Sequence, residues 1–162
     1  MFRVGLGQDS HRFGESKVDK PLVLGGVLIS GGPKINEADS DGDVLLHALC
    51  NALGQAIGGP SLGVYATPMA KKGTEDSKEY VLHILKQVKE KGYRVNNVGF
   101  MIETQRPRLE QYNLVMRKSI SSLLGITIDD VGITVTSGKD LTAFGKGEGI
   151  QVFAIVSLVK NE

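Results

Sequence analysis

The chain has 162 residues with a net charge of +1, of which 41% are hydrophobic and 23% charged, as in one ordinary globular domain spanning residues 1–162. A charge this close to neutral argues against nucleic acid as a partner, and no apolar run or basic amphipathic helix predicts a membrane span or surface. The single Cys50 excludes an intramolecular disulfide, and a first strand that begins at the N-terminus leaves no signal peptide, so we expect a cytoplasmic protein.

The first predicted strand carries the first candidate metal ligands. Residues 2–6 alternate apolar and polar side chains and lead into residues 7–13 (Gly-Gln-Asp-Ser-His-Arg-Phe). In extended backbone, residues two apart point to the same side, so Asp9 and His11 should project together. Taken singly, Asp9 could instead be a turn residue and His11 an exposed loop residue.

Residues 39–47 predict the start of a helix that carries a third ligand. After a polar loop at 14–20 and a hairpin at 21–30 turning at Gly25-Gly26, a second loop leads into Asp39-Ser-Asp-Gly-Asp. We expect Ser40 or Asp41 to cap this helix, with Asp43 completing a capping box, and the helix to end near Ile57. His47 lies one turn after Asp43, which could orient its imidazole. Alone, a histidine in such an apolar run is more often a buried core residue than a ligand.

Residues 58–74 show no helical or strand period. A loop of that length is either functional or a surface excursion, so a lid over a site and a mobile loop both stay open.

The rest of the chain alternates helices with strands. We expect helices at 75–91 and 109–125 and strands at 93–105, 131–136 and 150–159, with His83 structural and with Ile133 and Val135 facing inward. This order predicts an α/β (α+β) sandwich, in which a mixed four-stranded sheet has helices packed on one face and a small hairpin is added.

Asp9, His11 and His47 together predict a metal site. One carboxylate and two imidazoles leave a fourth position open on zinc, which is typical of catalytic zinc sites. The same ligand types make the facial triad of non-haem Fe(II) oxygenases, but those enzymes place a His-x-Asp pair on an all-β fold. The Asp-x-His order on an α/β pattern therefore favours zinc.

The chain resembles the 2-C-methyl-D-erythritol 2,4-cyclodiphosphate synthase family from end to end. The matching segments are residues 7–13, 24–29, 40–49, 76–77, 105–108 and 145–150. The Asp-x-His motif combined with Ser40-Asp-Gly-Asp-x-x-x-His47 is the most specific of them.

This resemblance implies a homotrimer with active sites between neighbouring subunits and one zinc ion per subunit, held by Asp9, His11 and His47. Mg²⁺ or Mn²⁺ is possible as a second metal. The substrate would be 4-diphosphocytidyl-2-C-methyl-D-erythritol 2-phosphate. Its 2-phosphate attacks the β-phosphorus and expels CMP in the non-mevalonate route to isoprenoid precursors.

The resemblance also assigns the remaining site residues. Catalytic positions fall to Asp39 and Ser137. Substrate-binding positions fall to Asp9, Ser10, His11, Asp39, Ser40, Tyr65, Thr104, Gln105, Arg106, Pro107, Arg108, Leu109, Thr136, Ser137, Lys139 and Lys146.

Several positions depart from the family pattern. Asp39 replaces a histidine that helps with the substrate phosphate, and Lys139 replaces a glutamate that binds the second metal. Pro60 stands where an acid contacts the ribose. These departures keep open a non-catalytic relative that retains zinc and binds a phosphorylated ligand.

Overall fold

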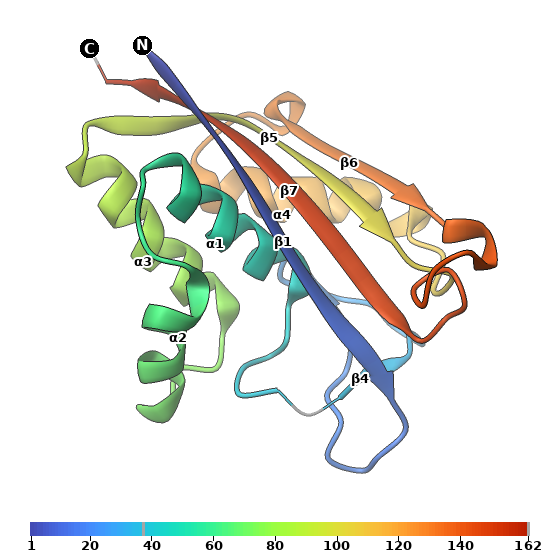
Figure 1. Ribbon diagram of the computed structural model, residues 1–162. Coiled ribbons are helices and arrows are strands. Elements are labelled where there is room, and N and C mark those ends of the chain that lie inside the picture. Colours follow the sequence, from blue (N-terminus) through green and yellow to red (C-terminus); the bar gives the residue numbers. More distant parts are fainter. Residues whose placement is uncertain (37, 162) are drawn as a thin grey trace.

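The computed structural model describes residues 1–36 and 38–161. It contains one long twisted sheet with helices along one side (Figure 1). The strands lie in the order β4-β1-β7-β5-β6. Their bounds are β1 Phe2–Gly14, β4 Lys34–Ile35, β5 Tyr93–Glu103, β6 Val131–Thr136 and β7 Gly149–Lys160. The sheet therefore has five strands, one more than the four predicted. The additional strand is β4, which pairs with the end of β1 through Phe13 and Ile35.

The strand directions bring three strand ends together. β7 is antiparallel to both β1 and β5, and β5 is parallel to β6. The carboxyl ends of β1, β5 and β6 consequently lie at the same end of the sheet, as the arrowheads in Figure 1 show. Every site segment predicted after one of these strands starts from that end.

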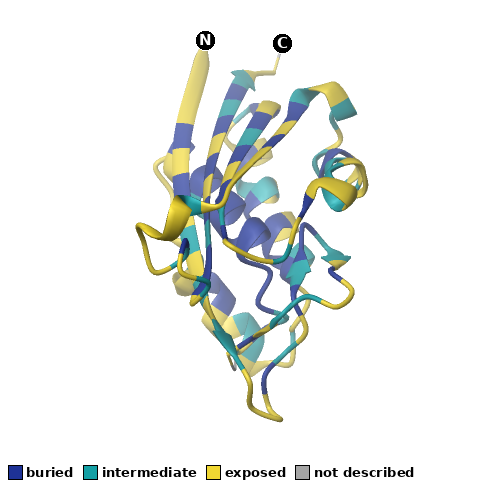
Figure 2. Cartoon of the chain, turned by 90° about the vertical axis from the view of Figure 1, so that its right-hand side faces the viewer, coloured by how far each residue is buried: buried dark blue, intermediate teal, exposed yellow. Residues whose placement is uncertain are grey.

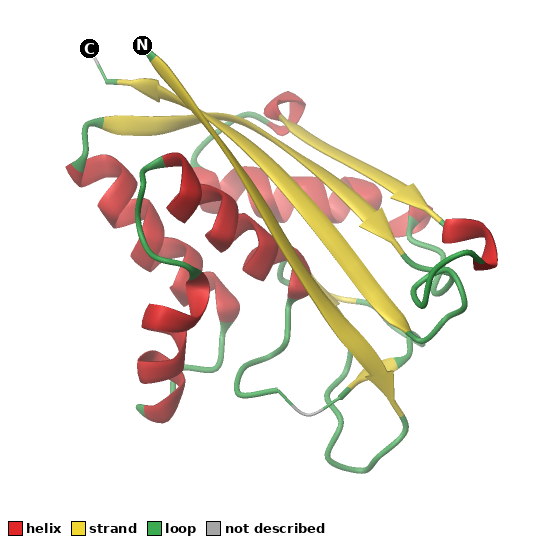
Figure 3. Ribbon diagram, viewed as in Figure 1, coloured by secondary structure: helices red, strands yellow, loops and turns green. Residues whose placement is uncertain are grey.

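In the part of the chain that the structure describes, four helices lie on one side of the sheet (Figure 3). They are α1 Val44–Ala56, α2 Leu62–Lys71, α3 Ser77–Glu90 and α4 Asn113–Leu124. α1, α3 and α4 pack against the strands, as predicted, and α2 packs against α1 and α3. Short 3-10 turns precede α4 (η1 Glu110–Tyr112), β6 (η2 Ile128–Asp130) and β7 (η3 Gly138–Asp140). The predicted hairpin is present as β2 Val23–Leu24 and β3 Val27–Leu28. Its turn residues Gly25 and Gly26 have φ of 61° and 75°, the left-handed region that tight hairpin turns require.

The core lies between the sheet and α1. Alternate residues of β7 face this core and are buried, and the buried bands of the strands are visible in Figure 2. These β7 residues are Ile150, Val152, Ala154, Val156 and Leu158. Val98, Phe100 and Ile102 of β5 are buried as predicted. Val135 of β6 shares the face of the buried Val131 and Ile133, as predicted, but it is 39% exposed. Val135 lies in the last part of β6 and lines a pocket there, which explains its exposure.

Two sequence expectations about helices are wrong. α1 begins at Val44, and its cap is Asp43, whose side chain accepts the N–H of Leu46; neither Ser40 nor Asp41 caps it. Residues 58–74 are not a loop, because most of that segment forms α2. Pro68 lies inside α2 and obscured its helical pattern, since proline supplies no N–H to a helix.

Among the described residues, none of the helices combines the length and apolar character needed to cross a bilayer.

Candidate metal centre and substrate cleft

The candidate metal centre forms where α1 crosses β1. Gly5 and Gly7 of β1 lie directly beneath α1, and a Cβ placed on Gly7 would be 2.1 Å from the Ala48 carbonyl oxygen. Only glycine allows helix and strand backbones to approach so closely. The approach brings His47, the neighbour of Ala48, down onto the strand face that carries Asp9 and His11.

The three predicted ligands do come together. His47 Nδ1 lies 3.0 Å from Asp9 Oδ2, and His11 Nε2 lies 3.4 Å from the same oxygen. One ligand atom from each of the three residues lies within 4.8 Å of the others. Two imidazoles and a carboxylate converge on one point at the end of β1.

The polar atoms of this cluster fit a cation. His11 Nε2 is buried, and it has no hydrogen-bond partner within the part of the chain that the structure describes. Burial would raise the pKa of Asp9, but its contacts with the imidazoles of His11 and His47 outweigh that effect and hold the pKa well below its ordinary value. Asp9 is thus an ionised carboxylate, and a metal ion would satisfy the unpaired imidazole nitrogen. The donor set matches zinc.

Asp43 does not orient His47, contrary to the sequence prediction. Its carboxylate accepts the backbone N–H groups of Gly25, Gly26 and Leu46 instead, which ties the hairpin to the start of α1. Burial raises the pKa of Asp43 to about 6, and those three N–H groups limit the rise. The partners of His47 Nε2 are the Ser77 hydroxyl at 2.8 Å and the Ser40 hydroxyl at 3.3 Å.

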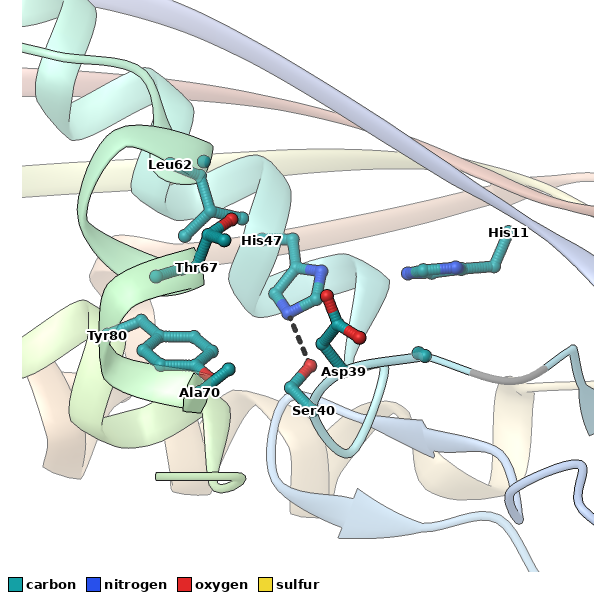
Figure 4. Close-up of a pocket in the computed structure, with 11 residues that line it drawn as sticks. His11, Asp39, Ser40, His47, Leu62, Thr67, Ala70 and Tyr80 are labelled. Carbon is teal, nitrogen blue, oxygen red and sulfur yellow. Dashed lines mark hydrogen bonds between the residues drawn. The ribbon is translucent and has the colours of Figure 1, made fainter. Parts of the chain in front are cut away.

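A cleft of about 330 Å³ opens beside the metal ligands (Figure 4). His11, Asp39, Ser40 and His47 line one side of it. The opposite side consists of Tyr80 and of α2 residues, namely Leu62, Gly63, Ala66, Thr67 and Ala70. α2 therefore has the position that a lid over the site would have, but it is a helical wall.

Sequence reasoning did not find this wall. Leu62, Thr67 and Tyr80 carry no motif, and their shared position depends on how α2 and α3 pack. The helical pattern of α2 was the only signal that could have found Leu62 and Thr67.

Ser10 and Tyr65 were also predicted to bind substrate, but neither lines the cleft. Ser10 is exposed, on the opposite face of β1 from Asp9 and His11. Tyr65 belongs to α2 and is buried, with its ring stacked on that of His83 in α3 at a centroid distance of 4.8 Å. This stacking is consistent with the predicted structural role of His83.

A second, more polar pocket of about 270 Å³ lies at the ends of β5 and β6. It contains most of the predicted residues from that region, namely Thr104, Gln105, Pro107, Arg108, Leu109, Ser137 and Lys139, together with Glu110 and Val135. The predicted residues Arg106, Thr136 and Lys146 do not line it. The Arg106 guanidinium instead lies over the Phe13 ring, 5.7 Å from its centroid.

The turn that carries Lys139 has an unusual backbone. Lys139 and Asp140 have φ of 48° and 60°, directly after Gly138 at 68°. Residues other than glycine adopt this left-handed region at an energetic cost, which is often accepted at functional sites. Gln105 holds the turn by donating its Nε2–H to Asp140 Oδ1 at 3.0 Å.

The two pockets have no lining residue in common. Within one chain, the candidate metal ligands and the residues of the second pocket therefore lie in separate places at the same end of the sheet.

Fold and site together define an α/β protein with a candidate catalytic metal centre. The chain belongs to the YgbB family, whose family model matches residues 2–159. The resemblance stated from the sequence motifs is confirmed.

Named relatives and solved structures agree with this assignment. The 2-C-methyl-D-erythritol 2,4-cyclodiphosphate synthase of Chlamydia muridarum is 40% identical over 161 residues, which are 99% of this chain and 89% of that protein. A 2C-methyl-D-erythritol-2,4-cyclodiphosphate synthase solved in its CDP-bound form is 30% identical, with a TM-score of 0.84 and coverage of 97% of this chain and 100% of that one. The bifunctional IspDF of Campylobacter jejuni gives a TM-score of 0.89 at 30% identity; all of this chain matches, but only 43% of that protein.

Proposed function

We propose that this chain is a cyclodiphosphate synthase, a phosphorus–oxygen lyase of isoprenoid precursor biosynthesis. It would convert 4-diphosphocytidyl-2-C-methyl-D-erythritol 2-phosphate to 2-C-methyl-D-erythritol 2,4-cyclodiphosphate and CMP. The observation that carries the proposal is the convergence of Asp9, His11 and His47 beside a cleft, in a chain 40% identical to a protein named for this reaction.

The reaction needs positioning more than it needs a protein nucleophile. A 2-phosphate oxygen forms a bond to the β-phosphorus, and the bond from that phosphorus to the oxygen bridging it to the α-phosphorus breaks, so CMP leaves with the electron pair. The obstacle is the repulsion between two anionic groups. Asp9, His11 and His47 would hold one Zn²⁺ per subunit, and zinc bound there supplies Lewis-acid polarisation of a phosphoryl oxygen.

The chain's own cleft residues would do the rest of the positioning. Ser40 lies beside His47 in the cleft, where its hydroxyl can donate to the 2-phosphate. The apolar wall from α2 suits the methylerythritol carbon skeleton and keeps water away from the phosphates. Asp39, which we propose as a catalytic residue, lies across the cleft from this α2 wall, on the same side as His47.

The second pocket suits the cytidine diphosphate end of the substrate. Arg108 and Lys139 give this pocket two cationic side chains, although Glu110 lines it as well. Ser137 lines the same pocket at the other proposed catalytic position. The charge of Lys139 could replace part of what a second ion, Mg²⁺ or Mn²⁺, would provide. A solved relative with CDP bound supports nucleotide recognition by this fold.

We also propose a homotrimer with a complete site at each subunit interface. The metal half-site and the second pocket are separate within one chain, so a neighbouring copy could bring the two together. The sheet face turned away from the helices exposes an apolar groove of about 410 Å³ that includes Leu6, Met101, Phe153 and Ile155. Exposed apolar surface of this kind marks association sites.

Two further parts of the proposal concern the whole chain. Residues 1–162 would form a single domain, which the one hydrophobic cluster shared by the sheet and its helices supports. A cytoplasmic location remains a prediction from the single, buried Cys50.

A non-catalytic zinc-binding relative is the alternative function. Asp39 favours it, because an acidic side chain in the cleft repels the substrate phosphates. Non-haem iron chemistry would use the same three ligands, and metal analysis that found iron in place of zinc would revive it.

A ³¹P NMR time course of the zinc-loaded protein with the cytidyl diphosphate substrate tests these functions. Appearance of CMP together with a cyclic diphosphate would support the synthase, and repeating the run without Mg²⁺ would reveal whether a second metal is needed. An unchanged spectrum from a folded, zinc-loaded protein would favour the non-catalytic alternative.

A further inference from the structure

Ser77 connects the candidate metal ligand His47 to a second carboxylate. It is the first residue of α3 and is fully buried. Its Oγ lies 2.8 Å from His47 Nε2 and donates its proton to Asp41 Oδ1 at 2.5 Å. The hydrogen bonds thus run from the nitrogen of His47 that faces away from Asp9, through Ser77, to Asp41.

The number of protons available decides which group donates and which accepts in this series of hydrogen bonds from His47 through Ser77 to Asp41. An ionised carboxylate can only accept, and Asp41 accepts from the Ser77 hydroxyl, the Ser77 N–H and the Asp43 N–H. The single hydroxyl proton of Ser77 is therefore used on Asp41, and its oxygen offers a lone pair to His47. A hydrogen bond at 2.8 Å then requires a proton on Nε2.

We infer that Ser77 and Asp41 are positioning residues that hold His47 in its Nε2–H tautomer. In that tautomer Nδ1 carries the free lone pair. Nδ1 lies 3.0 Å from Asp9 Oδ2, and an ionised Asp9 can only accept, so a metal ion bound between these two atoms takes the place of a proton on Nδ1. A metal ion binds only such an unprotonated nitrogen. The pair therefore performs the orienting function that the sequence suggested for Asp43. This inference rests on the proposed metal centre.

The surroundings of Ser77 keep this arrangement rigid. The Asp41 N–H donates to the Glu75 carbonyl at 2.8 Å, so the loop before α1 is bound to the start of α3 at two points. Because Ser77 is fully buried, water cannot easily take the place of a deleted hydroxyl. Removing the hydroxyl would leave the N–H of a metal-bound His47 with only the more distant Ser40 oxygen at 3.3 Å.

Zinc titration and ¹⁵N-resolved imidazole NMR of the full chain test the inference. The variants are Ser77→Ala, which removes the hydroxyl, and Ser77→Thr, which keeps one. Ser121→Ala is the matched control, since Ser121 is a buried helical serine that bonds only to the Lys118 carbonyl, away from the metal ligands. We expect Ser77→Ala to weaken zinc binding roughly 10- to 100-fold, the usual effect of losing such a partner. Ser77→Thr should restore most of the affinity, and Ser121→Ala should bind as the wild type does.

The NMR measurement separates positioning from a general loss of structure. In the zinc-loaded wild type we expect a His47 Nε2–H signal that exchanges slowly with water, and in Ser77→Ala a fast-exchanging signal despite an unchanged fold. Equal zinc affinity and an equally slow Nε2–H in Ser77→Ala would overturn the inference alone. A wild type that binds no zinc would overturn the metal centre itself, and the inference with it.

Discussion

Gly7 and Ala48 are in direct backbone contact: a Cβ on Gly7 would lie 2.1 Å from the Ala48 carbonyl oxygen and 2.3 Å from the Ala52 nitrogen. This contact sets the separation between β1 and α1, and hence between Asp9 and His47. The metal centre depends on a residue with no side chain.

Gly7→Ala should therefore damage both stability and metal binding. The added methyl group meets backbone atoms that cannot rotate away, so α1 must shift, at a cost of about 1–3 kcal/mol in the free energy of unfolding. A shift of α1 also separates His47 from Asp9, so zinc affinity should fall. Chemical denaturation and zinc titration measure the two effects. Gly63→Ala is the control, because a Cβ there meets no atom within 4 Å; equal results for the two variants would contradict the argument.

His47→Ala should abolish stoichiometric zinc binding. Two ligands would remain, and the buried Nε2 of His11 would have to bind an ion with Asp9 alone. His83→Ala is the matched control, since His83 is exposed on α3 and stacks on Tyr65 away from the triad. Metal content measured after dialysis separates the two variants. Full zinc content in His47→Ala would refute the assignment of this ligand.

The sequence allowed the candidate metal ligands to be chosen because the position of each rests on local geometry. Strand alternation puts Asp9 and His11 on one face, and the apolar run around His47 makes its helix unmistakable. No comparable local rule links Ser77 to His47. They are 30 residues apart, and their contact exists only because α3 packs beside α1.

The elements that were missed are those whose local pattern is weak. β4 has only two residues and is a strand because it pairs with the end of β1 and, through Ile35, with Lys20. α2 contains Pro68 and lacks a clear helical period of apolar residues, so its sequence was interpreted as a loop. Its helical form comes from packing on α1 and α3, which a single sequence does not reveal.

Ile155→Asp should disrupt self-association while leaving the metal centre intact. Ile155 is 52% exposed in the apolar groove of the outer sheet face, where a neighbouring copy is proposed to pack. Light scattering should report a smaller particle, and turnover should fall because the second pocket of a neighbour is lost. Zinc content should not change, since all three ligands belong to one chain. Val18→Asp, at an exposed position in the loop after β1, is the control. An unchanged particle size in Ile155→Asp would exclude this face as the interface.

Lys139→Gly should lower activity without lowering stability. Glycine adopts the φ of 48° found at Lys139 freely, so the substitution relieves backbone strain in the folded state. It also gives the unfolded chain more conformational freedom, which opposes folding. Because the two effects oppose each other, the free energy of unfolding should change by no more than about 1 kcal/mol. The second pocket loses a cation, so KM for the anionic substrate should rise. Lys139→Arg keeps the charge and should retain most of the activity. If Lys139→Gly turned over substrate as the wild type does, the ammonium group would have no role in binding.

The metal-free wild type should lose stability relative to the Asp43→Asn variant as the pH rises from about 4 to about 6. The quantity compared is the free energy of unfolding of the two proteins. Burial raises the pKa of Asp43 from 3.8 to about 6, so the folded state binds this proton more tightly than the unfolded state does. The resulting stabilisation is complete below the unfolded pKa and is lost as the pH passes through the folded pKa. A shift of about two pKa units corresponds to at most roughly 3 kcal/mol. Denaturation of both proteins in a chelator at pH 4, 5, 6 and 7 measures the difference, and Asp43→Asn serves as its own control because it cannot titrate. A wild type that instead gained stability over this range would mean that the N–H groups of Gly25, Gly26 and Leu46 outweigh burial and keep Asp43 ionised.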